Sequence, residues 1–244
     1  MRISIEAWFV IGIYLFYISN SLKLLHNNQL ILCMTLGKWK VICPDSQWQI
    51  LRKTPYLFNP FLANSPIFCG TWSTATEANN IEAAIAIDEF VNALSPLNYF
   101  VIILFVMMCL CIPLALLTYG TGFVFLPMML ITYTTILVML AVLYTKRTEL
   151  GLSQRNYFSI AFDCIVCPPY AINLIRKITW QYKVKFNLIE FAVSKLNRDD
   201  FSKLVQGLIL RLDEQLLNED VNSVRCEKLK TYRCKLLGFQ NECK

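Results

Sequence analysis

No Asp, Glu, Lys, Arg or His occurs anywhere between Phe90 and Thr145. A helix that crosses a lipid bilayer needs about 20 apolar residues, so this uncharged stretch is long enough for two such helices. The sequence Tyr-Gly-Thr-Gly at residues 119–122 lies near its middle, and glycines reverse a chain at low steric cost. The stretch therefore predicts a transmembrane helical hairpin over residues 97–145, with one helix on each side of this turn.

The competing interpretation is a soluble protein that buries the same hairpin in its core. Hydrophobic residues make up 56% of the chain and charged residues only 16%, whereas soluble domains average about 45–50% and about 25%. The remaining segments are too short and too polar to cover two helices that are apolar on all sides. Bilayer helices tolerate proline as a kink, so Pro113 and Pro127 do not exclude the hairpin. We therefore expect an integral membrane protein that is mostly α-helical.

A second hydrophobic segment runs from Ile3 to Ser19, with Glu6 as its single charged residue. It is long enough to be a membrane anchor, and a cleaved signal peptide is the alternative. Signal peptides begin with a positive region and end with small residues at the cleavage site. Here only Arg2 is positive and the candidate cleavage sequence is weak. We expect an uncleaved N-terminal anchor within residues 1–22.

The distribution of Lys and Arg predicts the orientation. Of the 23 such residues, five lie in residues 20–96 and 17 in residues 146–244, and the hairpin turn has none. Positive residues are enriched in cytoplasmic loops. A hairpin places both of its flanks on one side, so we expect these two regions in the cytoplasm and the N-terminus outside. The expected location is a bacterial inner (plasma) membrane.

Residues 23–96 are predicted to form a cytoplasmic region. Its first half mixes short apolar runs with turn residues, a pattern typical of irregular or short-stranded structure. An acidic helix is predicted over residues 74–94, because Thr74 and Glu77 have the spacing of a capping box. The sequence Ser95-Pro96 is the expected end of this helix.

Residues 146–244 are predicted to form a basic, helical tail close to the membrane. Within the tail, the apolar segment 157–175 contains Asp163 and is interrupted by Pro168-Pro169. A central carboxylate and a pair of prolines offset the apolar contribution, so we expect an interfacial or re-entrant broken helix.

The later part of the tail carries weaker patterns. Residues 178–188 alternate between apolar and polar, which fits either a strand or a poorly patterned helix. Two helices are expected after it, at residues 199–217 and 222–237, and Gly238 is the expected stop of the second.

Three residues of the broken segment are the candidates for chemistry. Cys164 and Cys167 form a single C-x-x-C, a spacing found in redox pairs and, when doubled, in zinc sites. The alternative is that they are small apolar residues that fill a packed surface. Asp163 is either a buried ligand or proton site, or a carboxylate paired with Arg155, Arg176 or Lys177.

The sequence lacks the residues and motifs on which other catalytic and metal-binding sites depend. His26 is the only histidine. A zinc site at Cys164 and Cys167 would need further ligands, and the candidates are His26, Cys226, Cys234 and Cys243. No metalloprotease, nucleophile-elbow, phosphate-loop or dinucleotide-binding motif occurs. The sequence thus predicts no metal, no cofactor and no catalytic residue, and no basic run indicates nucleic-acid binding.

The expected partners are the lipid bilayer and either another membrane protein or a second copy of this chain. We expect a non-catalytic interaction or assembly factor. The first alternative is a membrane-bound enzyme or redox protein that uses Asp163, Cys164 and Cys167. The second alternative is an oligomeric transporter or channel subunit, although the uncharged hairpin offers no evident proton relay or ion ring.

Overall fold

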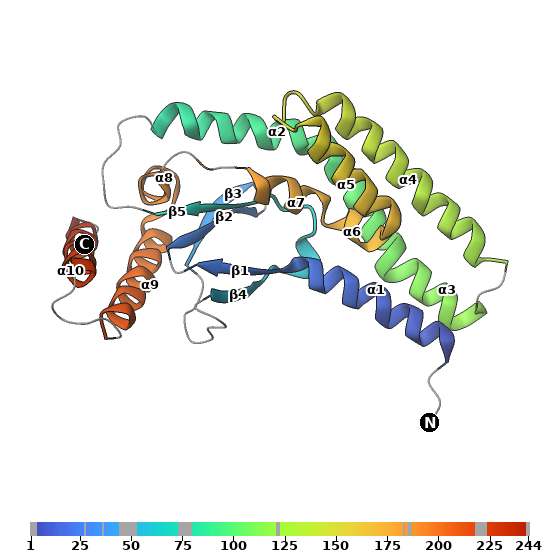
Figure 1. Cartoon of the computed structure of the whole chain (residues 1–244), viewed down its shortest axis with the longest axis horizontal. Helices are drawn as coiled ribbons and strands as arrows, with labels where there is room; N and C mark the ends of the chain where they lie inside the picture. Colours follow the sequence, from blue (N-terminus) through green and yellow to red (C-terminus); the bar gives the residue numbers. More distant parts are fainter. Residues whose placement is uncertain are drawn as a thin grey trace. The chain divides into compact units, whose positions relative to one another are not determined.

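The computed structural model is mostly helical with a small amount of sheet (Figure 1). It divides into two compact units. The first, here called the helical unit, comprises residues 1–23, 57–66 and 86–181, and the second, called the mixed unit, comprises residues 24–56, 67–85 and 182–244. The structure describes residues 4–26, 28–35, 37–43, 53–72, 80–120, 123–182, 184, 187–217 and 224–242, with the backbone alone for residues 80–84, 224–225 and 239–242.

The helical unit begins with α1, and a short 3-10 turn, η1, lies in its 57–66 segment. Its remaining elements follow one another along the chain and include a π-helical turn, η2. The bounds are α1 (Ile5–Ser21), η1 (Pro60–Leu62), α2 (Asn80–Val106), η2 (Met107–Cys111), α3 (Ile112–Tyr119), α4 (Phe125–Lys146), α5 (Gln154–Val166), α6 (Pro168–Ile172) and α7 (Leu174–Gln181). Helix α1 packs on α3 and α6, and α4 packs on α3 and α5.

Two helices are long and apolar enough to cross a bilayer, at residues 85–119 and 125–146. This confirms the two apolar helices expected from the uncharged stretch. Helix α3 ends at Gly120, whose φ of 65° lies in the left-handed region that favours glycine. Residues 121–122 of the expected turn lie outside the described residues.

The expected break at Ser95-Pro96 is wrong. Helix α2 continues through Pro96 into η2 and α3, so the acidic helix and the first apolar helix are one element. A proline removes one backbone donor and crowds the preceding turn. Leu94 and Leu97 on either side of it are both buried, so packing on both sides holds the helix together. The proposed capping box at Thr74 and Glu77 lies outside the described residues.

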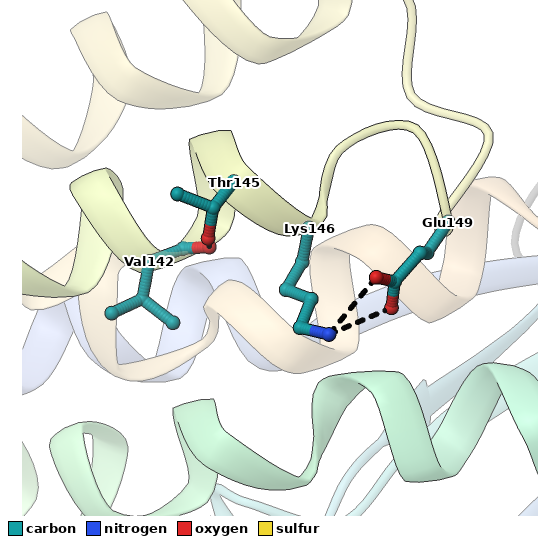
Figure 2. Close-up of polar contacts among 4 residues, drawn as sticks. All are labelled: Val142, Thr145, Lys146 and Glu149. Atoms are coloured by element: carbon teal, nitrogen blue, oxygen red, sulfur yellow. Dashed lines mark hydrogen bonds and ion pairs between the residues drawn. The ribbon is translucent and has the colours of Figure 1, made fainter.

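The C-terminal end of α4 is marked by polar contacts (Figure 2). The Lys146 ammonium lies 2.9 Å from both carboxylate oxygens of Glu149. The Thr145 hydroxyl donates a hydrogen bond of 2.8 Å to the carbonyl of Val142. The guanidinium of Arg147 lies 4.7 Å from the centre of the Tyr144 ring. Charged side chains therefore begin directly where the apolar helix ends.

The broken helix expected over residues 157–175 is present. Ser153 accepts a hydrogen bond from the Asn156 amide and begins α5. The helix ends at Cys167, whose backbone is not helical, and Pro168-Pro169 then starts α6. Proline lacks an amide donor and is suited to the first turn of a helix, so the break is local in origin.

Residues 178–181, for which a strand was one alternative, belong instead to α7. Ile178 and Thr179 are successive residues, and both are fully buried, as is Ile175. A strand would point successive side chains to opposite faces, whereas a helix surrounded by packing partners buries neighbours together. Tertiary packing therefore overrides the alternating pattern.

The mixed unit contains an antiparallel sheet in the order β3-β2-β5. Its strands are β2 (Gln29–Thr35), β3 (Lys38–Ile42) and β5 (Ile67–Thr71), and its register pairs Cys33 with Lys40 and Leu32 with Phe68. A separate two-stranded sheet pairs β1 (Leu22–His26) with β4 (Lys53–Leu57). These strands confirm the short-stranded structure expected in the first half of residues 23–96.

The helices of the mixed unit are α8 (Leu188–Lys195), α9 (Arg198–Leu217) and α10 (Val224–Glu242). Helix α9 confirms the helix expected at 199–217, and it buries an apolar face at helical spacing. Helix α8 packs on β3 and, where it begins, closely on β5: a Cβ added to Gly70 would lie 2.8 Å from a methyl of Leu188. Helix α10 continues through Gly238, so the expected stop there is wrong; Gly238 is not among the described glycines with positive φ.

Candidate functional site

The most developed polar cluster in the helical unit surrounds Arg176, which lies on α7 and is 4% exposed. Its Nη2 donates hydrogen bonds of 2.6 Å to the carbonyls of Asn59 and Leu62. Its Nη1 donates to the side-chain oxygen of Asn173 at 3.1 Å and to the hydroxyl of Ser21 at 3.4 Å. One guanidinium thus joins the end of α1, the η1 segment and α7.

The residues around Arg176 are also hydrogen-bonded to one another and to nearby backbone. The Ser21 hydroxyl and the Asn173 amide both donate to the Tyr17 carbonyl, at 3.0 and 3.1 Å. The Tyr17 hydroxyl donates to the carbonyl of Pro60. The side chain of Asn59 accepts a hydrogen bond from the Phe61 amide at 3.0 Å and begins η1. That turn positions the carbonyls that Arg176 binds, because short polar side chains favour turns by bonding to nearby backbone.

The four groups that accept hydrogen bonds from Arg176 in the described part of the chain are all uncharged. Burial lowers the pKa of Arg176 from its usual value, yet a guanidinium keeps its charge in proteins. The ring of Phe58 lies 5.9 Å from the guanidinium carbon, a distance at which an aromatic face attracts a cation. The cluster therefore holds a buried positive charge with carbonyl, amide and hydroxyl oxygens, and its evident effect is to tie three chain segments together.

Asp163 lies one turn before the end of α5 and pairs with Lys177 of α7. Of the three partners considered from sequence, the structure thus selects Lys177. Both side chains are partly exposed, at 37% and 24%. The pKa of Lys23 is lowered, first by burial and then by repulsion from Lys177. Asp163 therefore partly neutralises a group of basic residues.

Cys164 and Cys167 lie at the break between α5 and α6. Cys164 is 1% exposed, and burial raises the pKa of its thiol to about 12. Burial also raises the pKa of Cys167. Reactive cysteines require a thiolate, which forms where the pKa is lowered and the sulfur is accessible. The environment of Cys164 is the opposite, so it resembles a packing residue more than an attacking thiol.

The thiols considered for zinc do not assemble into a ligand set within the described part of the chain. No group of three or more His, Cys, Asp or Glu side chains is close enough there to hold a metal ion. His26, Cys226 and Cys234 belong to the mixed unit, whereas Cys164 and Cys167 belong to the helical unit. Cys243 lies outside the described residues.

The helical unit also contains an apolar cavity of about 470 Å³. Its walls come from α1, from η2 with α3, from α4 and from the α5–α6 break, and they include Trp8, Phe16, Met108, Leu116, Met129 and Pro168. The volume lies in the range of about 300–1,000 Å³ that is usual for small-molecule sites. No charged side chain lines it. The cavity can therefore accept an apolar group.

One wall of this cavity begins at the π-helical turn η2. A π-turn widens the helix by one residue, and such turns frequently occur at functional sites. The Tyr14 hydroxyl of α1 donates a hydrogen bond of 2.6 Å to the carbonyl of Cys109 within this turn. That contact fixes α1 against the widened helix.

Sequence reasoning missed both features. It treated Arg176 only as a possible partner of Asp163, and it assigned no role to Tyr17, Ser21, Asn59 or Asn173. The spacing of Asn173 and Arg176, three residues apart at the start of α7, was an available signal. Their partners are more than 100 residues away along the chain, so the signal could not identify them.

Comparison of the chain with protein-family models, with curated proteins and with solved structures finds no match in any of the three.

Proposed function

We propose that this chain is a multi-pass membrane protein whose two long apolar helices and α1 cross the bilayer and whose role is non-catalytic, in interaction or assembly. One observation carries the proposal: the two long apolar helices are mostly uncovered. Only 44% of the most apolar window of residues 85–119 is buried, and only 28% of that of residues 125–146. A core helix of a soluble protein would be covered by its own chain, so these surfaces require another apolar environment.

The threonines of these helices support the same environment. The hydroxyls of Thr118, Thr132, Thr134 and Thr135 each donate to a carbonyl four residues earlier in their own helix, at 2.8–2.9 Å. Water would satisfy such hydroxyls at a soluble surface. In hydrocarbon a hydroxyl without a partner is costly, so bonding within the helix is favoured.

A non-catalytic role is supported by the state of the candidate residues. Asp163 is paired with Lys177, and Cys164 is buried with a raised pKa. Both features disfavour the redox alternative, because a reactive cysteine needs an accessible thiolate. No observation in the described residues favours a channel.

The proposal includes an orientation. Lys146 and Arg147 directly follow α4, and positive residues next to a span favour the cytoplasmic side. Residues 20–96 and 146–244 would then face the cytoplasm, and the N-terminus would lie outside. The mixed unit, with its own sheet and helices, is the part proposed to meet a protein partner.

The test compares one arginine substitution in each unit. Leu137 near the centre of α4 is 57% exposed, and Leu210 on α9 is 60% exposed. Leu137→Arg should disfavour membrane insertion by about 2.5–3.5 kcal/mol, the penalty for arginine at the centre of a spanning helix. Leu210→Arg should change stability by less than about 0.5 kcal/mol, as a substitution at a water-facing surface does.

The measurement is the fraction of full-length chain that stays with membranes in alkaline carbonate. The parent and Leu210→Arg chains should stay, and a larger fraction of the Leu137→Arg chain should be released, although its helix at residues 85–119 is unchanged. Release of the parent chain, or release of Leu210→Arg as large as that of Leu137→Arg, would refute the membrane placement. The non-catalytic role is tested by a chain with Asp163→Asn, Cys164→Ser and Cys167→Ser, which should retain the crosslinked partners of the parent; loss of those partners would favour the redox alternative.

A further inference from the structure

We propose that the apolar cavity of the helical unit binds one acyl chain of a membrane lipid. This inference rests on the proposed function, because the bilayer supplies the ligand. The cavity is formed by four segments that are distant in sequence, so it is a property of the folded unit rather than a gap beside one helix.

The length of the cavity walls suits an extended chain. The residues of α1 that line it run from Ile5 to Phe16, a distance of about 17 Å at 1.5 Å per residue. On the facing wall they run from Met108 to Leu116, about 12 Å. A cavity of about 470 Å³ whose walls extend over this length can accommodate an extended hydrocarbon chain.

The lining has the chemistry of a hydrocarbon site. Its residues are aliphatic, aromatic, sulfur-containing, glycine or proline, and the Tyr133 phenol contributes the only hydroxyl. Burial of a charged or strongly polar group against such walls would cost several kcal/mol without a compensating hydrogen bond. A lipid headgroup is thereby excluded from the cavity, whereas its methylene chain is accepted.

The cavity opens toward a surface on which lipid is the proposed solvent. Trp8, Phe9 and Phe16 line the cavity and are also more than half exposed. Exposed aromatic side chains at a cavity mouth leave an apolar path into it. Under the proposed membrane placement, acyl chains are the molecules that reach this mouth at high concentration.

Two features keep the slot open. The π-turn η2 places Met108 on the cavity wall, and the Tyr14 hydroxyl bonds to the carbonyl of Cys109 in the same turn. In addition, Gly12 of α1 lines the cavity, and a Cβ built on it would meet no atom within 4 Å. A helix interior disfavours glycine by roughly 1 kcal/mol relative to alanine, so the absence of a side chain here has a stability cost and leaves space.

The empty space at Gly12 provides the test. Gly12→Leu fills part of the slot without a collision on the backbone side, and Gly12→Ala adds a single methyl as the matched control. The full-length chain is placed in phosphatidylcholine vesicles in which a fraction of the lipid carries a diazirine in its acyl chain. After illumination, the labelled peptides are mapped by mass spectrometry at Met108 and Met129 in the cavity and at Leu130, whose side chain lies outside it.

We expect labelling of Met108, Met129 and Leu130 in the parent chain and in Gly12→Ala. In Gly12→Leu, labelling of the two methionines should fall at least fivefold while Leu130 stays labelled. Labelling of Leu130 without the methionines, or methionine labelling unchanged by Gly12→Leu, would overturn the acyl-chain site and leave the membrane placement standing. Absence of label at all three residues would overturn both.

If Gly12→Leu does not elute as a folded chain, Met129→Phe serves as a second filling variant, read at Met108. The same fall at Met108 with Leu130 retained is expected. Unchanged labelling of Met108 would again overturn the site.

Discussion

Each unit of this protein buries one arginine, and the two are held differently. Arg176 in the helical unit and Arg211 in the mixed unit are 4% and 3% exposed. Arg176 donates two hydrogen bonds of 2.6 Å to backbone carbonyls. Arg211 makes longer contacts, to the Thr54 hydroxyl at 3.4 Å and to the Cys43 sulfur at 3.7 Å. Both arginines therefore contact distant chain segments, but only Arg176 does so through short hydrogen bonds to backbone carbonyls.

The two units also differ in where their large apolar side chains lie. In the mixed unit the apolar residues of β2 and β5 are inside, where Leu30, Ile31, Leu32 and Phe68 are completely buried. In the helical unit many large apolar side chains are outside, as Leu114, Leu126 and Leu130 illustrate. The interior of the helical unit combines fully buried apolar side chains, such as Leu104 and Met139, with the polar contacts of the Arg176 cluster.

The strongest test of this difference replaces each arginine by methionine. Arg176→Met removes two short hydrogen bonds from a charged donor, to the carbonyls of Asn59 and Leu62, each of which contributes about 1–3 kcal/mol. We expect the helical unit to lose about 2–6 kcal/mol. Arg211→Met should be neutral within about 1 kcal/mol or stabilising, because an apolar side chain of similar size replaces a poorly bonded buried charge. The measurement is proteolysis of the full-length chain at rising temperature, with peptides of each unit followed separately.

An Arg211→Met chain that loses as much stability as Arg176→Met would contradict the comparison. The role of the two carbonyls is checked by Arg176→Lys, which keeps the charge but has a single point donor. It should retain only part of the stability of the parent chain.

A smaller effect is expected within the mixed unit from two glycines. Gly70→Ala places a methyl 2.8 Å from Leu188 and 3.3 Å from Val184, and such overpacking costs about 1–3 kcal/mol. Gly207→Ala on α9 meets only Cys43, at 3.7 Å. It should raise stability by up to about 1 kcal/mol, because alanine favours helix over glycine. The same proteolysis assay, read on peptides of the mixed unit, measures the stability of Gly70→Ala and Gly207→Ala. If Gly207→Ala is also destabilised, α9 is packed more tightly around Gly207 than its contacts indicate.

The smallest effect is expected at the ion pair of the helical unit. Asp163 and Lys177 are partly exposed, and such pairs contribute about 0–1 kcal/mol. Asp163→Asn should therefore lower stability by less than about 1 kcal/mol, as should Glu149→Gln in the exposed pair with Lys146. A loss several times larger for Asp163→Asn, with Glu149→Gln unchanged, would show that Asp163 is a buried charge with a role of its own.

Local sequence predicted those parts of the structure that depend on neighbouring residues. The double proline at 168–169 ends one helix and starts another without help from elsewhere, and the structure has this break. The same holds for α9, whose apolar residues recur at helical spacing. For the candidate site, the sequence identified Asp163 and the set of bases from which its partner came, but not the cluster around Arg176.

Where a prediction from local sequence was wrong, contacts with distant residues determined the structure. Pro96 signalled a helix end, yet Leu94 and Leu97 are buried around it and the helix continues. The alternation at 178–181 fitted a strand, yet these residues are helical because the packing of α7 buries neighbours together. Propensity contributes a kcal/mol or less per residue in most cases, and burial of a large side chain contributes more.

The lack of any charged residue between Phe90 and Thr145 was sufficient to predict the two long apolar helices that the structure has at residues 85–119 and 125–146. The cavity lined by α1, α3, α4 and the α5–α6 break could be found only in the folded chain, as could the contacts of Arg176 with carbonyls more than 100 residues away. The two kinds of feature depend on interactions of different range. Charge and periodicity act over a few residues, whereas a cavity and a buried guanidinium are defined by partners that the chain brings together when it folds.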